Sequence, residues 1–249
     1  MGSEIELVDV QAGYGRAAPV LRGFSVAVPA GQVVCLVGPN GAGKSTVLKV
    51  AAGLLAPRSG RVLVGGRDVT GLGPQRMLAA GVALVLQGHS VFREMTVEEN
   101  VLLGGYTLTD KAVRAARAAF VKELFPVVGE RWHSLAGLLS GGQQKQVEFA
   151  RSLMVDPKVV LLDEPSMGLD PKATGTIFEQ VTRMRDAGAA VLLVEQNARR
   201  ALATADLGCV LDLGRVHISG PAAELLTDPQ LGELYLGGRP GEKPITEQR

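Results

Sequence analysis

The sequence predicts an α/β domain with a mainly parallel core sheet, and the order of its apolar patterns is the main evidence. Short runs of β-branched and other apolar residues alternate with segments of helical periodicity, which is the order that parallel strands and their crossover helices require. The chain has 249 residues, a length that suits one domain with a substantial core. The first strands are expected to form a small antiparallel layer beside the core sheet.

Each expected strand is a short, mostly apolar run bounded by turn residues. Strands are expected at residues 5–10, 24–28, 33–37, 61–64, 82–86, 159–162, 190–194, 207–211 and 215–219. The runs at 33–37, 82–86, 159–162 and 190–194 are continuously apolar, as strands buried on both faces should be. The last two strands flank Gly214 and are predicted to form a hairpin.

The expected helices combine apolar periodicity with proline near some starts and glycine or proline after some ends. They are expected at residues 46–52, 74–80, 111–124, 140–155, 171–186, 198–205, 221–226 and 228–236. Residues 90–155 are predicted to form a helical subdomain inserted into the sheet domain, with Thr96 and Glu99 at capping-box spacing. Residues 1–238 would then form one domain, and 239–249 a polar tail.

Composition excludes several classes of protein. The formal net charge of +1 argues against a basic surface for nucleic acid. Cys35 and Cys209 lie in apolar, strand-like runs, which favours buried free thiols in a reducing compartment over a disulfide. No apolar run approaches the roughly 18 residues of a membrane span, and the N-terminus has no signal region. We therefore expect a cytoplasmic protein whose membrane attachment comes through a partner.

A phosphate loop follows the strand at 33–37. Residues 38–46 fit the pattern G-x-x-x-x-G-K-[ST] between a buried strand and a helix, which is the required context. The expected phosphate-binding residues are Gly38, Pro39, Asn40, Gly41, Ala42, Gly43, Lys44, Ser45 and Thr46. Their backbone N–H groups and the helix N-terminus can surround a phosphate, Lys44 supplies charge to the β- and γ-phosphates, and Ser45 suits Mg²⁺. Alone, the loop predicts only a nucleoside triphosphate.

Two carboxylates follow the apolar run at 159–162. Asp163 is placed to reach Mg²⁺ beside the phosphate loop, and Glu164 to orient and deprotonate an attacking water. The alternative is an acidic strand end that faces solvent, which the complete phosphate loop upstream disfavours. The strands at 33–37, 82–86, 159–162 and 190–194 should bring Gly38, Gln87, Asp163 and Gln196 to the carboxyl edge of the sheet.

The stretch Ser140, Gly141, Gly142 and Gln143, preceded by a leucine, is the most specific signal. Small residues at a helix start can bind an anion, although alone they could be a plain N-cap. With the phosphate loop and the two carboxylates, the stretch resembles the signature of ATP-binding cassette (ABC) ATPases. The resemblance extends to about residue 238, with the motifs in family order.

The resemblance implies further roles. Tyr14 matches the aromatic residue that stacks on adenine, and Gln87 matches the glutamine that touches Mg²⁺ and water and senses the transporter. Residues 166–170 match the loop that crosses between subunits. The family works as a head-to-tail dimer with two ATP molecules, so Ser140 and Gly142 would act on the partner's nucleotide. Gln196 stands where the family usually has a histidine that contacts the γ-phosphate, and it cannot carry an imidazolium charge.

Four stretches are similar to the ATPases of branched-chain amino-acid uptake: residues 91–100, 104–106, 193–198 and 235–238. The resemblance implies an ABC importer subunit at the cytoplasmic face of the inner membrane, with ATP and Mg²⁺ as cofactors. Its partners would be membrane permeases, a second ATPase subunit and, indirectly, an extracytoplasmic solute-binding protein, with no nucleic acid. The alternatives are a soluble ABC ATPase of DNA repair or translation, and a nucleotide-binding regulator that does not hydrolyse ATP.

Overall fold

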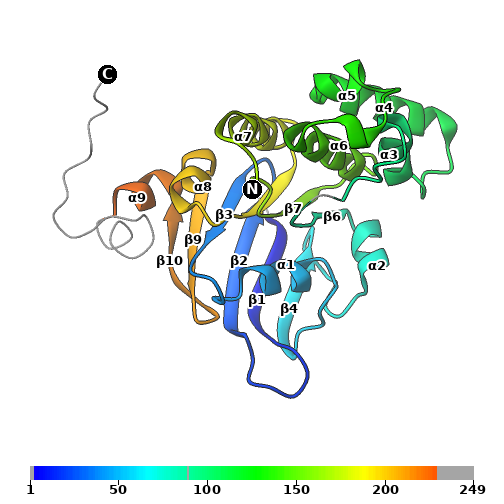
Figure 1. Ribbon diagram of the computed structural model, residues 1–249. Coiled ribbons are helices and arrows are strands. Elements are labelled where there is room, and N and C mark those ends of the chain that lie inside the picture. Colours follow the sequence, from blue (N-terminus) through cyan, green and yellow to red (C-terminus); the bar gives the residue numbers. More distant parts are fainter. Residues whose placement is uncertain (1–2, 89, 229–249) are drawn as a thin grey trace, which may run out of the picture.

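The computed structural model describes residues 3–88 and 90–228, which form two β-sheets and the helices that pack against them (Figure 1). The core sheet has the strand order β10-β9-β3-β8-β7-β6, and the smaller sheet the order β2-β1-β4-β5. The core strands are β3 (Val33–Val37), β6 (Val82–Val85), β7 (Val159–Asp163), β8 (Ala190–Val194), β9 (Leu207–Asp212) and β10 (Arg215–Pro221). The smaller sheet contains β1 (Ser3–Ala12), β2 (Leu21–Pro29), β4 (Ser59–Val64) and β5 (Arg67–Asp68).

The core sheet is parallel from β9 to β6, and β10 closes one edge as an antiparallel hairpin with β9. The smaller sheet is antiparallel throughout. Both features agree with the sequence prediction. The strand β5 was missed because it is two exposed, charged residues after a glycine turn and carries no apolar pattern.

Alternating side chains of the core strands enter two separate hydrophobic clusters. In β3, Val33, Cys35 and Val37 belong to the cluster on the side of the helices. Val34 and Leu36 of the same strand belong to the cluster that faces the smaller sheet. Because both faces are covered, every residue of β3, β7 and β8 is buried.

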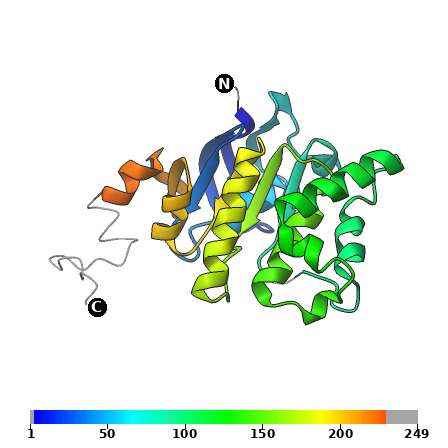
Figure 2. The ribbon, with the colours of Figure 1, turned by 90° about the horizontal axis from the view of Figure 1, so that it is seen from above.

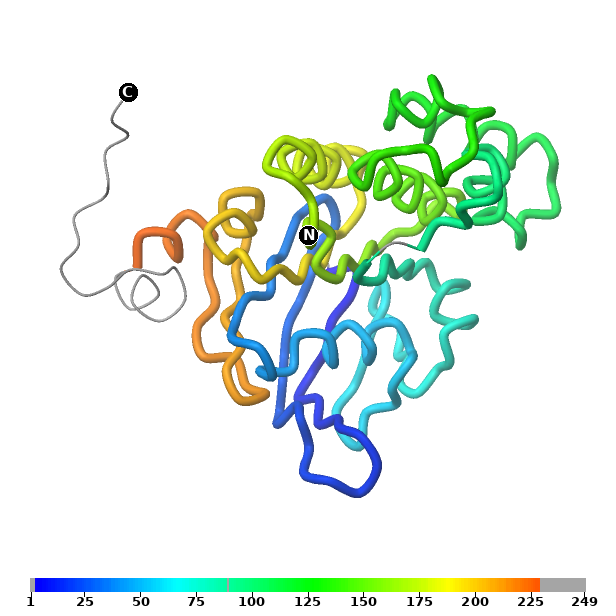
Figure 3. Tube along the Cα trace, viewed as in Figure 1, coloured from blue at the N-terminus to red at the C-terminus, as the bar shows by residue number. Residues whose placement is uncertain are grey.

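The helices have these bounds: α1 Lys44–Ala51, α2 Pro74–Ala79, α3 Val97–Gly104, α4 Lys111–Leu124, α5 Pro126–Glu130, α6 Gly141–Leu153, α7 Pro171–Asp186, α8 Ala198–Thr204 and α9 Ala222–Thr227. A short 3₁₀ turn lies at Ala136–Leu138. The helices α6, α7 and α8 lie on one side of the core sheet, and the N-terminal sheet lies on the other (Figures 1 and 3). The expected helix at 228–236 and the tail lie outside the described residues.

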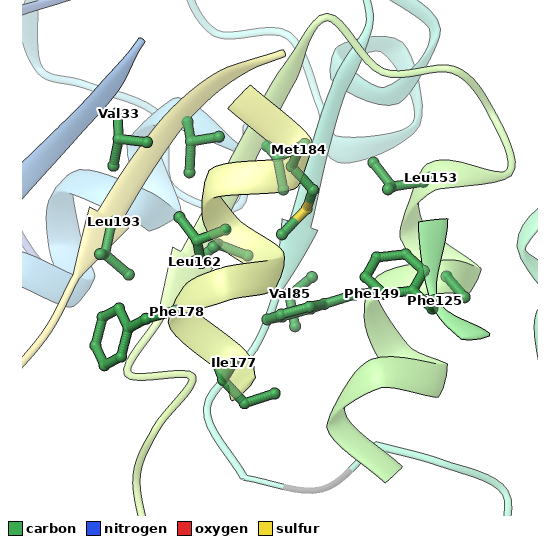
Figure 4. Packing of buried hydrophobic residues seen from close by; sticks show 14 of the residues in the cluster. Val33, Val85, Phe125, Phe149, Leu153, Leu162, Ile177, Phe178, Met184 and Leu193 are labelled. Carbon is green, nitrogen blue, oxygen red and sulfur yellow. The ribbon is translucent and has the colours of Figure 1, made fainter. Parts of the chain in front are cut away.

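The helices α3 to α6 gather at one end of the molecule, between β6 and β7 in the sequence (Figure 2). The predicted capping box at α3 is confirmed: the Thr96 side chain accepts from the Glu99 N–H at 3.1 Å, and the Glu99 carboxylate accepts from the Thr96 N–H at 2.7 Å. Phe125 and Phe149 are fully buried and lie 6.3 Å apart between ring centroids. Both rings belong to one hydrophobic cluster, which also contains side chains of α7 and of the core strands (Figure 4). This cluster connects the helices α3 to α6 with the core sheet.

The two cysteines are free and buried, as the sequence predicts. Burial raises the pKa of Cys35 to about 12, to which the neighbouring Cys209 adds, and burial likewise raises the pKa of Cys209 to about 12. In the part of the chain that the structure describes, no helix has the length and apolar character needed to cross a membrane.

These thiols should report on the integrity of the two-layer core. We expect neither Cys35 nor Cys209 to react with iodoacetamide at pH 8 in the folded protein, because almost no thiolate forms and the sulfurs are covered. Both should react in urea, and mass spectrometry counts the adducts. Alkylation of either thiol while the far-ultraviolet circular dichroism stays native would contradict this packing.

Candidate functional site

The predicted site residues meet at the carboxyl edge of the core sheet. The strand order β3-β8-β7-β6 brings together the segments that follow these four strands. Gly38 follows β3, Gln196 lies two residues beyond β8, Asp163 ends β7 and Gln87 lies two residues beyond β6. The expectation that these positions share one edge is therefore confirmed, and that edge is where parallel α/β sheets place their ligands.

The phosphate loop requires glycine at two of its positions. A Cβ on Gly38 would lie 2.2 Å from the carbonyl oxygen of Leu211, so no side chain fits between the loop and β9. Gly43, directly before α1, has φ 110° and would place a Cβ 2.9 Å from the side chain of Leu21. Both glycines allow the backbone to turn closely and start α1 at Lys44, whose first N–H groups have no helical partner.

Lys44 is nearly buried, and its ammonium group lies within the loop. It donates to the carbonyl oxygens of Gly38 at 2.8 Å and Pro39 at 3.0 Å. Burial lowers the pKa of Lys44, whereas the charges of Glu164 and Asp163 act in the opposite direction. The carbonyl groups are neutral acceptors, and an anionic phosphate oxygen at this place would accept more strongly.

Asp163 has the properties of a cation ligand. It is 8% exposed, and its buried Oδ1 has no hydrogen-bond partner among the described residues. Burial raises its pKa, the charge of Glu164 adds to the rise, and a hydrogen bond with Ser45 lowers it. A buried carboxylate oxygen without a partner, next to a hydroxyl group, suits a hard cation such as Mg²⁺. The residues present therefore fit this ion.

Glu164 is held in an unusual backbone conformation next to Gln87. Its φ is 44°, in the left-handed region that costs a non-glycine residue about 1–3 kcal/mol. Its N–H donates to the carbonyl oxygen of Val194 at 2.9 Å, which ties it to β8. Its carboxylate accepts from the Gln87 amide at 2.8 Å. The two side chains are thus in direct contact, although 77 residues separate them.

Gln196 is exposed, and its backbone N–H donates to Glu195 Oε2 at 3.3 Å. Glu195 itself is buried, with 2% of its surface exposed, and its Oε1 accepts from the Ser166 N–H at 3.0 Å. The sequence motifs alone assign no role to Glu195. One signal was present: a carboxylate directly follows five buried residues of β8, as Glu164 directly follows β7.

Sequence reasoning also missed a buried group of charges on α6. Lys145 and Glu148 form an ion pair at 2.6 Å, with side chains 3% and 1% exposed. Lys145 donates to the Gly88 carbonyl oxygen, and Glu148 accepts from the Ser90 N–H. Arg151 donates to the Ser90 carbonyl oxygen at 2.9 Å. These three side chains, spaced by three along α6, hold the segment that follows Gln87.

Ser140 is the N-cap of α6. Its hydroxyl accepts from the Gln143 N–H at 3.4 Å, and its own N–H donates to Gln143 Oε1 at 3.0 Å, which completes a capping box. Ser140 therefore caps α6, and its predicted role at an anion stays a prediction. A Cβ on Gly142 would lie 2.8 Å from Cβ of Ala173, so this glycine permits α6 to approach α7 closely. Gly141, between Ser140 and Gly142 in the sequence, is the first residue of α6.

Tyr14 lies beside the first turn of α1 with 48% of its surface exposed. Its hydroxyl is 3.5 Å from Thr46 Oγ1 and accepts from Lys49 Nζ at 3.2 Å. The hydrogen bond with Thr46 is the main cause that lowers the pKa of Tyr14. The aromatic ring is therefore next to the phosphate loop and open to solvent, as a stacking surface for a base must be.

Comparison with known proteins agrees with this geometry. The family model of the ABC transporter matches residues 21–167. The chain is 42% identical to the high-affinity branched-chain amino acid transport ATP-binding protein BraG of Pseudomonas aeruginosa, over 90% of this chain and 96% of that protein. It is 34% identical to the lipopolysaccharide export system ATP-binding protein LptB of Acidithiobacillus ferridurans, over 89% and 92%.

Among solved structures, the ADP conformation of an ATP-binding cassette of an ABC transporter matches with a TM-score of 0.85 and 28% identity. That match covers 96% of this chain and 100% of the other. It confirms the predicted fold: a mainly parallel core sheet with helices and an N-terminal antiparallel sheet. The chain therefore belongs to the ABC transporter family, and it is the ATP-binding ATPase subunit of a transporter complex that contains permease subunits.

Proposed function

We propose that this subunit drives the uptake of branched-chain or other hydrophobic amino acids from the cytoplasmic face of the inner membrane. The observation that carries the proposal is the 42% identity to BraG over nearly the whole length of both proteins. The identity to LptB over a similar length is lower, at 34%. Solute specificity resides in other subunits of such a complex, and the similarity to BraG supports the choice of solute.

The phosphate loop and α1 form the proposed triphosphate site. The loop N–H groups, except that of Ala42, which donates to the Pro39 carbonyl oxygen at 3.2 Å, would face the phosphates together with the positive end of α1. The Lys44 ammonium would exchange its two carbonyl acceptors for phosphate oxygens. Ser45 and Asp163 would hold Mg²⁺, with Gln87 beside them. When bound there, Mg²⁺ supplies neutralisation of charge on the β- and γ-phosphates. Tyr14 would stack on the adenine.

Glu164 is the proposed general base. Its carboxylate accepts the Gln87 amide at 2.8 Å and keeps acceptor capacity for a water molecule. Gln87 would therefore orient the base, and Gln196, exposed on the same sheet edge, would donate to the γ-phosphate. Glutamine donates a neutral hydrogen bond, so this arrangement relies on Glu164 for proton transfer.

The proposed working unit is a head-to-tail pair of ATPase subunits, either identical or different. Ser140, Gly142 and the loop at 166–170 would act on the nucleotide of the partner subunit. The membrane permeases would dock at the segment after Gln87, and a solute-binding protein would act through them. A net charge of +1 gives no support to a nucleic-acid partner.

Uptake assays test the proposed solute. Deletion of this gene in its own organism should abolish the high-affinity uptake of radiolabelled leucine, and the wild-type gene should restore it. Uptake of a basic amino acid serves as the control and should not change. Normal leucine uptake in the deletion strain, or a defect in lipopolysaccharide export instead, would overturn the assignment of the solute.

Lys44→Ala should lower ATP affinity about 10- to 100-fold, because it removes a charge-assisted contact to the phosphates, and should nearly abolish hydrolysis. Isothermal titration and phosphate release measure the two effects. Lys158→Ala, an exposed lysine at the opposite end of β7, is the matched control and should bind and hydrolyse ATP normally. Wild-type turnover in folded Lys44→Ala protein would refute the site.

Glu164→Gln should slow turnover by roughly 10²- to 10⁴-fold, because it removes the base and leaves the phosphate contacts in place. The ATP-bound dimer should then accumulate, and size-exclusion chromatography should show a dimer with ATP and a monomer with ADP. Ser140→Arg in the same background should block this dimer while the monomer still binds ATP. Turnover by Glu164→Gln at the wild-type rate would show that another group is the base.

The docking surface is predicted around Phe92. Phe92 is 51% exposed, whereas Val91 and Met95, the apolar residues near it in the same segment, are half-buried and complete the predicted surface. Exposed Leu86 and Tyr106 lie close along the chain. Phe92→Glu should reduce solute uptake by the assembled transporter without changing basal ATP hydrolysis. Val113→Glu, an equally apolar and exposed position on α4, is the control, and a normal uptake rate in Phe92→Glu would place docking elsewhere.

A further inference from the structure

Glu195 is a buried carboxylate at the end of β8 that none of the proposed catalytic steps uses. It is 2% exposed, and each of its oxygens accepts one backbone N–H: Oε1 accepts from Ser166 at 3.0 Å and Oε2 from Gln196 at 3.3 Å. Burial raises its pKa, and the hydrogen bonds from Ser166 and Gln196 oppose the rise. Burial of a carboxylate costs free energy unless it is paired or hydrogen-bonded. These two hydrogen bonds therefore offset part of the cost of burying Glu195.

Two hydrogen bonds hold the chain at the strained residue Glu164 and just after it. Glu164 has φ 44°, and its N–H is bonded to the carbonyl oxygen of Val194 in β8. Two residues later, the Ser166 N–H is bonded to the side chain of Glu195, the residue that directly follows β8. The consecutive residues Val194 and Glu195 therefore hold the chain at Glu164 and two residues after it. Strained backbone persists where the surroundings determine it from more than one side.

The same carboxylate contacts two segments that have different proposed roles at the nucleotides. The bond to the Ser166 N–H fixes the start of the loop at 166–170. Within this loop, the Leu169 N–H donates to the Ser166 carbonyl oxygen at 3.2 Å and forms a turn. The bond to the Gln196 N–H fixes the residue that follows β8. One buried side chain thus joins the loop expected to cross between subunits to the glutamine expected at the γ-phosphate.

We propose that Glu195 is a positioning residue that holds Glu164 and Gln196 in their catalytic arrangement. The inference rests on the proposed roles of Glu164 and Gln196. An amide at position 195 has one acceptor oxygen and one donor nitrogen, so it can accept only one of the two N–H groups and turns its own N–H toward the other. Either the turn after Glu164 loses its attachment to Glu195, or the Gln196 N–H loses its acceptor.

The test compares Glu195→Gln and Glu195→Ala with a matched control. Asp206 Oδ2 accepts the Val33 N–H at 2.7 Å at the opposite end of the core sheet. Asp206→Asn therefore makes the same chemical change away from the site. We expect Glu195→Gln to lower kcat by about 10- to 100-fold, as small misplacements of reacting groups do, with the Kd for ATP changed less than about threefold. Asp206→Asn should leave both constants near the wild-type values.

Two readouts separate positioning from a general loss of structure. In a background that carries both Glu164→Gln and Gln196→Ala, Glu195→Gln should reduce kcat little further, because both groups that it positions are already absent. A full additional 10-fold loss would overturn the proposal. Hydrogen exchange at the Ser166 amide should be slow in the wild-type protein and faster in both Glu195 variants. Exchange of the wild-type Ser166 amide at the rate of an unstructured peptide would also overturn it, even if neither variant folds.

Failure of this inference is distinguishable from failure of the proposed function. A normal kcat in Glu195→Gln removes the positioning role alone, since the effects of Lys44→Ala and Glu164→Gln do not depend on it. Normal turnover in Glu164→Gln would instead remove the proposed base, and the positioning role with it. The identity of the transported solute affects neither result, because ATP hydrolysis by the subunit is what is measured.

Discussion

The constraint on which the site depends is the parallel pairing of β3, β8, β7 and β6, because it brings four distant segments to one edge. Asp163 pairs with Val194, and Leu36 of β3 pairs with Val194 from the other side. The strand β8 therefore lies between the phosphate loop and the two carboxylates. The strand β8 is buried on both faces, by the helices on one side and by the antiparallel sheet on the other. Loss of this packing would separate the loop from the carboxylates.

Opposing electrostatic effects act on Lys44 and Asp163 at this edge. Lys44 is desolvated, which disfavours its charge, while the carboxylates of Glu164 and Asp163 favour it. Asp163 is also desolvated and lies next to Glu164, which disfavours its ionised form. A divalent cation and a triphosphate would add opposite charges between these groups. The charges of Lys44, Asp163 and Glu164 are thus complementary to those of a metal–nucleotide pair.

Much of the fold could be predicted from the sequence because the core strands are buried on both faces. Residues 33–37 and 190–194 are continuously apolar, and their observed bounds equal the predicted ones. The phosphate loop is local in sequence, so its residues were predictable as a group. The roles of Glu195 and Lys145 were not, because their burial depends on segments far along the chain. Ser166 lies 29 residues from Glu195, and Gly88 lies 57 residues from Lys145. From the sequence alone, Glu195 therefore looks like a solvated charge at a strand end, and Lys145 like a solvated charge on a helix.

The central claim is that ATP and its metal bind where the phosphate loop meets Asp163 at the carboxyl edge of the core sheet. A crystal structure of the Glu164→Gln subunit with ATP and Mn²⁺ in place of Mg²⁺ tests it most directly, since manganese can be located by its anomalous scattering. The account predicts a manganese peak within bonding distance of Ser45 Oγ or the Asp163 carboxylate, with the triphosphate in the loop beside Lys44. A peak at other residues, or a triphosphate bound away from the loop, would contradict it.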